Sequence, residues 1–180
     1  VTDSTASLTP ELVVDAGVPI RVVPLHVVVA GHEFTEGVDI TRDRLVEALT
    51  AHEQVSTSRP APRVFLDAYE AAAREGADAI VSIHISADMS GTVQSAQLAA
   101  TQSPVPVTVV DSRAIGMAMG YAVLSAAAAA AQGGSVAEVV AAARSRLAAT
   151  SLVFYVDTLE HLRRGGRIGS AAALLGSALA

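Results

Sequence analysis

The sequence predicts an α/β protein whose sheet is mostly parallel and is covered by helices on both faces. Two observations lead to this prediction. From residue 79 onward, short runs of β-branched and apolar residues alternate with longer stretches of helical periodicity, which is typical of a parallel sheet. In addition, 51% of the 180 residues are hydrophobic and 17% are charged, so the chain can bury the core of a full domain.

Shorter elements are expected in the amino-terminal half. Val1 resembles the last residue of a strand, and Thr9 and Pro10 have the features of a helix N-cap and first turn. In order, we expect the end of a strand at residue 1, a helix over 9–17, a strand over 20–30, a returning strand over 31–37, a helix over 41–49, a loop over 56–62 and a helix over 64–76.

Strands and helices alternate more clearly in the second half. We expect a strand over 79–85, a helix over 90–102, a strand over 105–110, helices over 115–131 and 135–147, a strand over 152–156 and a short helix over 157–164. Because the rhythm changes near Thr150, we expect an α/β domain over 1–150 and the beginning of a second, incomplete α/β domain over 151–180. The chain is expected to be a fragment, since it starts at the end of a strand pattern and stops inside a helical one.

The composition disfavours several classes of protein. All 12 basic residues are arginine and 18 residues are acidic, and the formal charge of -6 argues against nucleic-acid binding. The absence of cysteine removes disulfides, thiol catalysis and cysteine-ligated zinc. The five histidines lack metal-ligand spacing, so no metal is expected. No apolar run suits stable membrane insertion and no leader precedes Val1, so a cytoplasmic location is the simplest expectation.

Candidate binding residues lie in the loops that follow the predicted strands, where ligands of open α/β sheets bind. Five loops are rich in hydroxyl, glycine or acidic residues: 2–5, 57–58, 86–92, 111–113 and 157–158. In one of them, Ser90, Gly91 and Thr92 place hydroxyls and free backbone N–H groups at the start of a helix, which suits an anion. The alternative is that Ser90 only caps its own helix.

Two other groups of residues have both a functional and a purely structural interpretation. The segment 56–60 offers three hydroxyls and a guanidinium for anion oxygens, but it also fits a solvated loop whose hydroxyls bond their own backbone. Arg163, Arg164 and Arg167 could bind a phosphate or an acidic protein surface. They could equally be cations placed favourably at a helix carboxyl terminus.

Catalytic and nucleotide-binding motifs are weak. His84, Asp88 and Ser90 are close in sequence, but triads are defined by geometry, and His84 inside an apolar strand fits a hydrogen-bonded core histidine better. The glycines at 165, 166 and 169 do not complete a dinucleotide-binding fingerprint.

Taken in order, the motifs resemble the DegV family of bacterial fatty-acid-binding proteins. They are Thr2-Asp3-Ser4-Thr5, Thr57-Ser58-x-Pro60, Ser90-Gly91-Thr92-x-Gln94-Ser95-Ala96, Asp111-Ser112, and Thr158-Leu159-Glu160-x-Leu162-Arg163-Arg164-Gly165-Gly166-Arg167-Ile168-Gly169. The resemblance implies a two-domain α/β carrier, not an enzyme, that encloses one long-chain fatty acid between its domains and has no cofactor. It also implies a partner, a separate fatty acid kinase, that phosphorylates the carboxylate for phospholipid synthesis.

The resemblance assigns roles to particular residues. Thr57 and Ser90 would hydrogen-bond the carboxylate, with Ser58, Gly91 and Thr92 nearby. Members commonly have Thr-Ser-Gln-Pro-Ser where this chain has Thr-Ser-Arg-Pro-Ala over 57–61, so the threonine is kept while two neighbours differ. Members are also about one and a half times longer, and a histidine that some of them use at the carboxylate cannot be placed here.

Two further expectations follow from the fatty-acid hypothesis. Ile115, Met117 and Met119 belong to an alanine- and methionine-rich helix that could line an acyl tunnel, although ordinary core packing also explains the methionines. Arg163, Arg164 and Arg167 are expected to dock the kinase. The alternative function is a hydrolase or phosphotransferase that uses the Asp, Ser and Thr loops.

Overall fold

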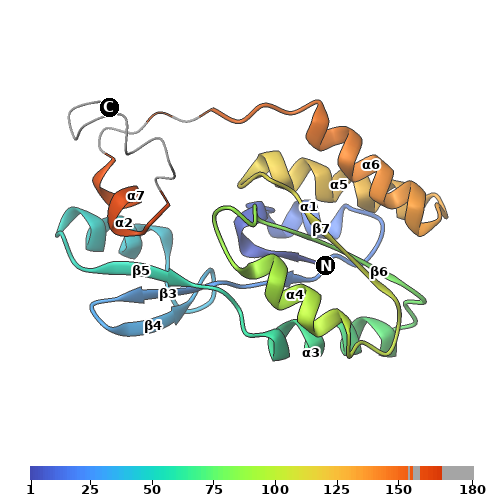
Figure 1. Cartoon of the computed structure of the whole chain (residues 1–180), viewed down its shortest axis with the longest axis horizontal. Helices are drawn as coiled ribbons and strands as arrows, with labels where there is room; N and C mark the ends of the chain where they lie inside the picture. Colours follow the sequence, from blue (N-terminus) through green and yellow to red (C-terminus); the bar gives the residue numbers. More distant parts are fainter. Residues whose placement is uncertain (154, 156–158, 168–180) are drawn as a thin grey trace.

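A four-stranded parallel sheet forms the centre of the computed structural model, which describes residues 1–153, 155 and 159–167 (Figure 1). The strand order is β2-β1-β6-β7, and each neighbouring pair is parallel. The strands are β1 (Thr2–Asp3), β2 (Val22–Val23), β6 (Ile80–His84) and β7 (Val107–Asp111). The predicted α/β class with a mostly parallel sheet is confirmed.

Helices cover both faces of this sheet, as the sequence predicted (Figure 1). One face packs against α3 (Pro62–Arg74) and α4 (Thr92–Ala100) through a core that includes Phe65 and Tyr69. The other face packs against α5 (Met117–Ala131) and α6 (Val136–Ala148) through a core that includes Met119.

Small residues let α5 approach the rest of the protein closely. A Cβ atom added to Gly120 would lie 2.5 Å from the backbone oxygen of Ala6, which belongs to the short 3-10 helix η1 (Ser4–Ala6). Ala122 and Ala126, farther along the same helix, are buried against the sheet. The alanine-rich sequence of α5 therefore forms a tightly packed core helix.

A second, antiparallel sheet lies beside the first, at the left of Figure 1. Its strand order is β4-β3-β5, formed by β3 (His26–Val29), β4 (His32–Thr35) and β5 (Val55–Ser58). Its core contains Val27, Val29 and Ile40 together with Ala48 of α2 (Arg42–Thr50).

This second sheet corrects two predictions. The apolar run over 20–30 is not one strand, because Pro24 has no N–H to donate to a ladder and the chain passes there from β2 into β3. Residues 56–58 are not a loop but part of β5, where Thr57 pairs with Val27 and Ser58 pairs with His26. Their side chains are exposed hydroxyl groups, as in a loop, although their backbone pairs with β3.

The remaining described helices are α1 (Pro10–Val14) and α7 (Glu160–Arg164). Three of the described helices begin with a side-chain cap, since Thr9 and Thr41 accept backbone hydrogen bonds and Ser135 forms a capping box with Glu138, whereas α3, α4 and α5 have none. The strand predicted over 152–156 is not found at 152, 153 and 155, and its other residues lie outside the described ones. The division into domains at residue 150 stays a prediction.

Candidate ligand-binding site

Three predicted loops meet at the carboxyl edge of the parallel sheet. Backbone hydrogen bonds join them: Gly116 N donates to Thr5 O at 2.8 Å, Ser86 N to Ala114 O at 3.0 Å and Ser112 N to His84 O at 3.0 Å. The loops after β1, β6 and β7 thus form one connected surface. The candidate loop at 157–158 lies outside the described residues.

The start of α4 contributes free donors to this surface. Gly91 is the N-cap residue, and no side chain caps the helix. Ser90 does not cap it either, because its Oγ lies 2.8 Å from Oγ1 of the fully buried Thr92. Among the described residues, the amides of 91–94 have no hydrogen-bond acceptor, which leaves an electropositive helix end.

The end of β5 reaches the same place. Thr57, Ser58 and Arg59 are exposed, and the chain then turns at the buried Pro60 into α3. The side chain of Arg59 lies directly against the backbone of Gly91, where an added Cβ would be 2.0 Å from Nη1. Through Arg59 the structure joins the 57–59 segment to the start of α4.

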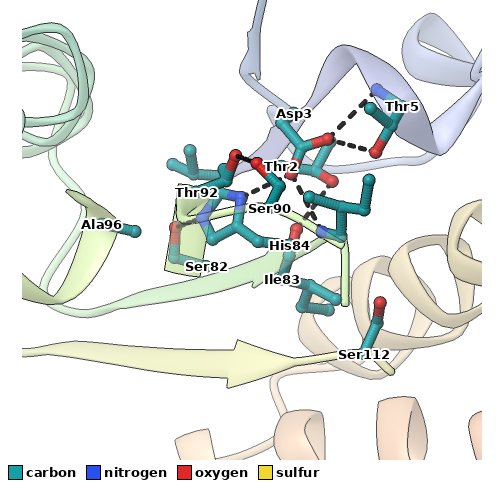
Figure 2. Close-up of polar contacts among 12 residues, drawn as sticks. Thr2, Asp3, Thr5, Ser82, Ile83, His84, Ser90, Thr92, Ala96 and Ser112 are labelled. Carbon is teal, nitrogen blue, oxygen red and sulfur yellow. Dashed lines mark hydrogen bonds and ion pairs between the residues drawn. The ribbon is translucent and has the colours of Figure 1, made fainter. Parts of the chain in front are cut away.

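A chain of fully buried polar side chains lies beneath these loops (Figure 2). Nδ1 of His84 is 2.9 Å from Oδ2 of Asp3, and Nε2 of His84 is 2.7 Å from Oγ of Ser82. Ser82 Oγ is in turn 2.9 Å from the hydroxyl of Tyr69. Asp3 also accepts hydrogen bonds from the backbone of Ile85 and Thr5.

One proton arrangement satisfies this chain. The carboxylate of Asp3 only accepts, so His84 donates from Nδ1, accepts at Nε2 from Ser82, and Ser82 accepts from Tyr69. Burial lowers the pKa of His84, although the hydrogen bond that its Nδ1 donates to Asp3 opposes this, and burial raises the pKa of Tyr69. His84 is therefore a neutral core histidine, as the sequence indicated.

The hydrogen-bonded side chains of Asp3, His84 and Ser82 are not arranged as an accessible hydrolytic site. His84 is bonded to Asp3 and Ser82, and not to Asp88 or Ser90 as a triad would require. Although Ser82, His84 and Asp3 follow the order of a catalytic triad, all three have 0% exposure, so no substrate reaches the serine. The network instead holds β1 and η1 against β6, and these two elements occupy the residues 2–5 for which the sequence predicted a loop.

A cavity of about 480 Å³ adjoins the site. Its lining residues include Met89, Ser112, Ile115, Ala118, Leu147 and Leu152. Of the residues predicted for an acyl tunnel, Ile115 lines this cavity and Met119 is fully buried in the core. Met117 is half-buried, and its sulfur would lie 3.2 Å from a Cβ at Gly120.

Another apolar cavity, of about 420 Å³, lies at the opposite edge of the sheet, beside Ile20 and Ile80.

The arginine cluster lies at the end of α7. Arg163, Arg164 and Arg167 are all exposed. Nε of Arg167 donates to the backbone oxygen of Met89 at 3.1 Å, and its Nη1 donates to Gly165 O at 2.5 Å. Because Met89 precedes Ser90, these bonds attach the end of α7 to the candidate site.

Metal-binding clusters and membrane-spanning helices are both absent from the part of the chain that the structure describes. No group of three or more His, Asp or Glu side chains is arranged there to hold a metal ion. Within the same residues, no helix combines the length and the apolar character that crossing a membrane requires.

The structure is that of an α/β protein whose parallel sheet has an uncapped helix start and exposed hydroxyl groups near its carboxyl edge. The family model described as "Uncharacterised protein, DegV family" matches residues 1–180, and the chain belongs to the DegV family. It is 51% identical to the DegV domain-containing protein SCO2569 of Streptomyces coelicolor and 44% identical to one from Deinococcus radiodurans. These alignments cover 100% and 99% of this chain and 63% of each relative, so the chain spans less than two thirds of their length.

Solved structures agree with this assignment. A fatty-acid-binding DegV family protein from Thermus thermophilus has a TM-score of 0.87 and 41% identity, over 99% of this chain and 63% of that protein. DegV of Bacillus subtilis, described as a fatty acid binding protein, has a TM-score of 0.87 and 31% identity, over 99% and 64%. A stearic acid-binding protein from Eubacterium ventriosum has a TM-score of 0.81 and 26% identity, over 95% and 60%.

Proposed function

We propose that the protein to which this chain belongs binds one long-chain fatty acid. Its carboxylate would lie where the end of β5 meets the start of α4, within reach of Thr57 and Ser90, with Ser58, Gly91 and Thr92 nearby. The observation that carries the proposal is that, within the described part of the chain, the amides of 91–94 beside these hydroxyls have no hydrogen-bond acceptor. Donors at a helix amino terminus stabilise a carboxylate through both hydrogen bonds and the helix dipole.

The acyl chain would enter the apolar cavity beside the site. Ile115, Ala118 and Leu147 supply apolar walls to the same cavity that Ser112 and Met89 line. Each buried methylene contributes about 0.8 kcal/mol, so the chain would supply most of the affinity while the polar groups fix its orientation. Met117 and Met119 would support the helix behind this wall.

A carrier that acts in the cytoplasm explains the site better than an enzyme does. The one Asp-His-Ser arrangement among the described residues is sealed from solvent, and the hydroxyl of Ser90 is hydrogen-bonded to Thr92 with no histidine bonded to either hydroxyl in that part of the chain. A carrier must hand over its ligand. We therefore propose that a separate fatty acid kinase phosphorylates the bound carboxylate for phospholipid synthesis, and that Arg163, Arg164 and Arg167 dock this kinase.

The direct test is mass spectrometry of an organic extract from the denatured full-length protein. We expect about one equivalent of a long-chain fatty acid. A nucleotide or sugar phosphate in place of a lipid would overturn the proposal.

A further inference from the structure

Arg59 is in an electrostatically unusual position. It lies at the amino end of α4, packed on Gly91, and its Nη1 donates only a long hydrogen bond of 3.4 Å to Oε1 of Gln94. Among the described residues, no carboxylate lies within ion-pair distance of its guanidinium. A helix amino terminus already carries partial positive charge, so a cation placed there is unfavourable unless an anion binds beside it.

The neighbouring groups also suit an anion. Among the described residues the amides of 91–94 have no acceptor, and the exposed hydroxyl of Thr57 and the half-buried hydroxyl of Ser90 offer further donors. A guanidinium holds a carboxylate with two parallel hydrogen bonds and also carries a positive charge. Neither a hydroxyl nor a glutamine side chain combines these two properties. The exposed side chain of Arg59 is free to turn from Gln94 toward such a ligand.

We propose that Arg59 is the counter-ion of the bound carboxylate and makes this chain select ionised acids over uncharged lipids of the same length. The proposal rests on the proposed function and adds the residue that sets its specificity for the head group.

The test compares two ligands with the same acyl chain, palmitate and hexadecanol, on the full-length protein by calorimetry after delipidation. We expect Arg59→Gln to weaken palmitate binding about tenfold, which corresponds to about 1.4 kcal/mol, and to leave hexadecanol binding unchanged. Arg59→Lys should recover part of the loss, because it restores the charge without the bidentate geometry.

Two control variants separate a direct charge effect from a structural one. Arg63→Gln removes an equal charge four residues away, from a side chain paired with Asp67 at 2.7 Å, and should leave both affinities unchanged. Gln94→Glu supplies a competing carboxylate beside Arg59 and should weaken palmitate binding several-fold without affecting hexadecanol.

The outcomes are distinct. An equal loss for palmitate and hexadecanol in Arg59→Gln would mean that Arg59 only braces the loop, and the inference would be wrong. Unchanged palmitate binding in that variant would also overturn it, while leaving the fatty-acid function intact. If the unmodified protein binds no palmitate at all, the proposed function fails together with the inference.

Discussion

Nδ1 of His84 lies 2.9 Å from Oδ2 of Asp3, although 81 positions separate these residues in the sequence and both are fully buried. The contact joins β6 to the loop after β1, and the hydroxyl groups of Ser82 and Tyr69 extend it to α3. A buried network whose members are all satisfied fixes one arrangement of the surrounding elements. Here it fixes the loop edge on which the candidate site is built.

The first prediction concerns the stability of the protein at different pH values. Because the pKa of His84 is lower in the folded protein than in the unfolded chain, the unfolded chain takes up this proton first as the pH falls. The contribution of His84 is complete above about pH 6.5 and is lost as the pH falls below that value, by up to about 1.4 kcal/mol per pH unit.

Urea denaturation between about pH 7.5 and 5.5 measures this loss over the range in which an unperturbed histidine titrates. Removal of an exposed histidine by His32→Gln should leave the pH dependence in place. Nitrogen NMR of His84 should show a proton on Nδ1 and none on Nε2. A charged His84 in the folded protein at pH 7 would contradict the proposed network.

The second prediction compares two glycines. Gly120→Ala should destabilise the protein by about 1–3 kcal/mol, because the new Cβ meets the backbone oxygen of Ala6, which cannot move alone. Gly91→Ala should keep the fold, because the atoms it meets belong to the flexible end of Arg59. Denaturation curves distinguish the two, and equal stability of Gly120→Ala and the unmodified protein would disprove the close packing of α5.

The third prediction concerns the hydroxyl groups at the proposed carboxylate site. Thr57→Ala and Ser90→Ala should each remove a hydrogen bond to a charged group, worth about 1.5–3 kcal/mol. Phosphorylation of the bound acid should fall sharply, whereas lipid content should fall less because the acyl chain supplies most of the affinity. Circular dichroism checks the fold, and an unaltered phosphorylation rate in both variants would place the carboxylate elsewhere.

The fourth prediction concerns kinase docking. The double variant Arg163→Glu/Arg164→Glu should bind lipid normally but associate more slowly with the kinase, and its defect should depend on ionic strength. Arg144→Glu/Arg146→Glu on α6 changes the charge equally and serves as the control. Arg167 is left intact because it bonds Met89 and Gly165. Equal phosphorylation rates for both double variants at low and high salt would reject the docking site.

Local patterns were sufficient to predict much of the fold. The apolar run at 79–85 corresponds to β6, and the alternating elements expected from residue 90 onward correspond to α4, β7, α5 and α6. Apolar periodicity, which adjacent residues determine, sets these elements, and among the three helices only α6 also begins with a side-chain cap. In contrast, β5 was missed because its strand character comes from pairing with β3, and its side chains at 56–58 have the polarity of a loop.

The candidate site was predictable only in part. Ser90, Gly91 and Thr92 lie at a helix start, as the sequence indicated. The partner of His84 could not be predicted, because Asp3 lies on the neighbouring strand β1 but 81 positions away in the sequence. The packing of Arg59 on Gly91 depends likewise on how β5 leaves the second sheet. Contacts between residues that are far apart in the sequence produce no local periodic pattern from which they could be predicted.

The antiparallel sheet is built from one continuous stretch of chain, residues 26–58, whose two ends pair with each other at His26 and Ser58. A unit with such local connections can open and close as a separate cooperative segment while the parallel sheet stays folded. A ligand held by both Thr57 and Ser90 would link the two sheets, so its binding energy would also protect this segment from opening. Amide hydrogen exchange should therefore slow more in β3 and β5 than in β6 and β7 when the proposed fatty acid is bound. The bound and ligand-free forms would then differ in the opening rate of the antiparallel sheet.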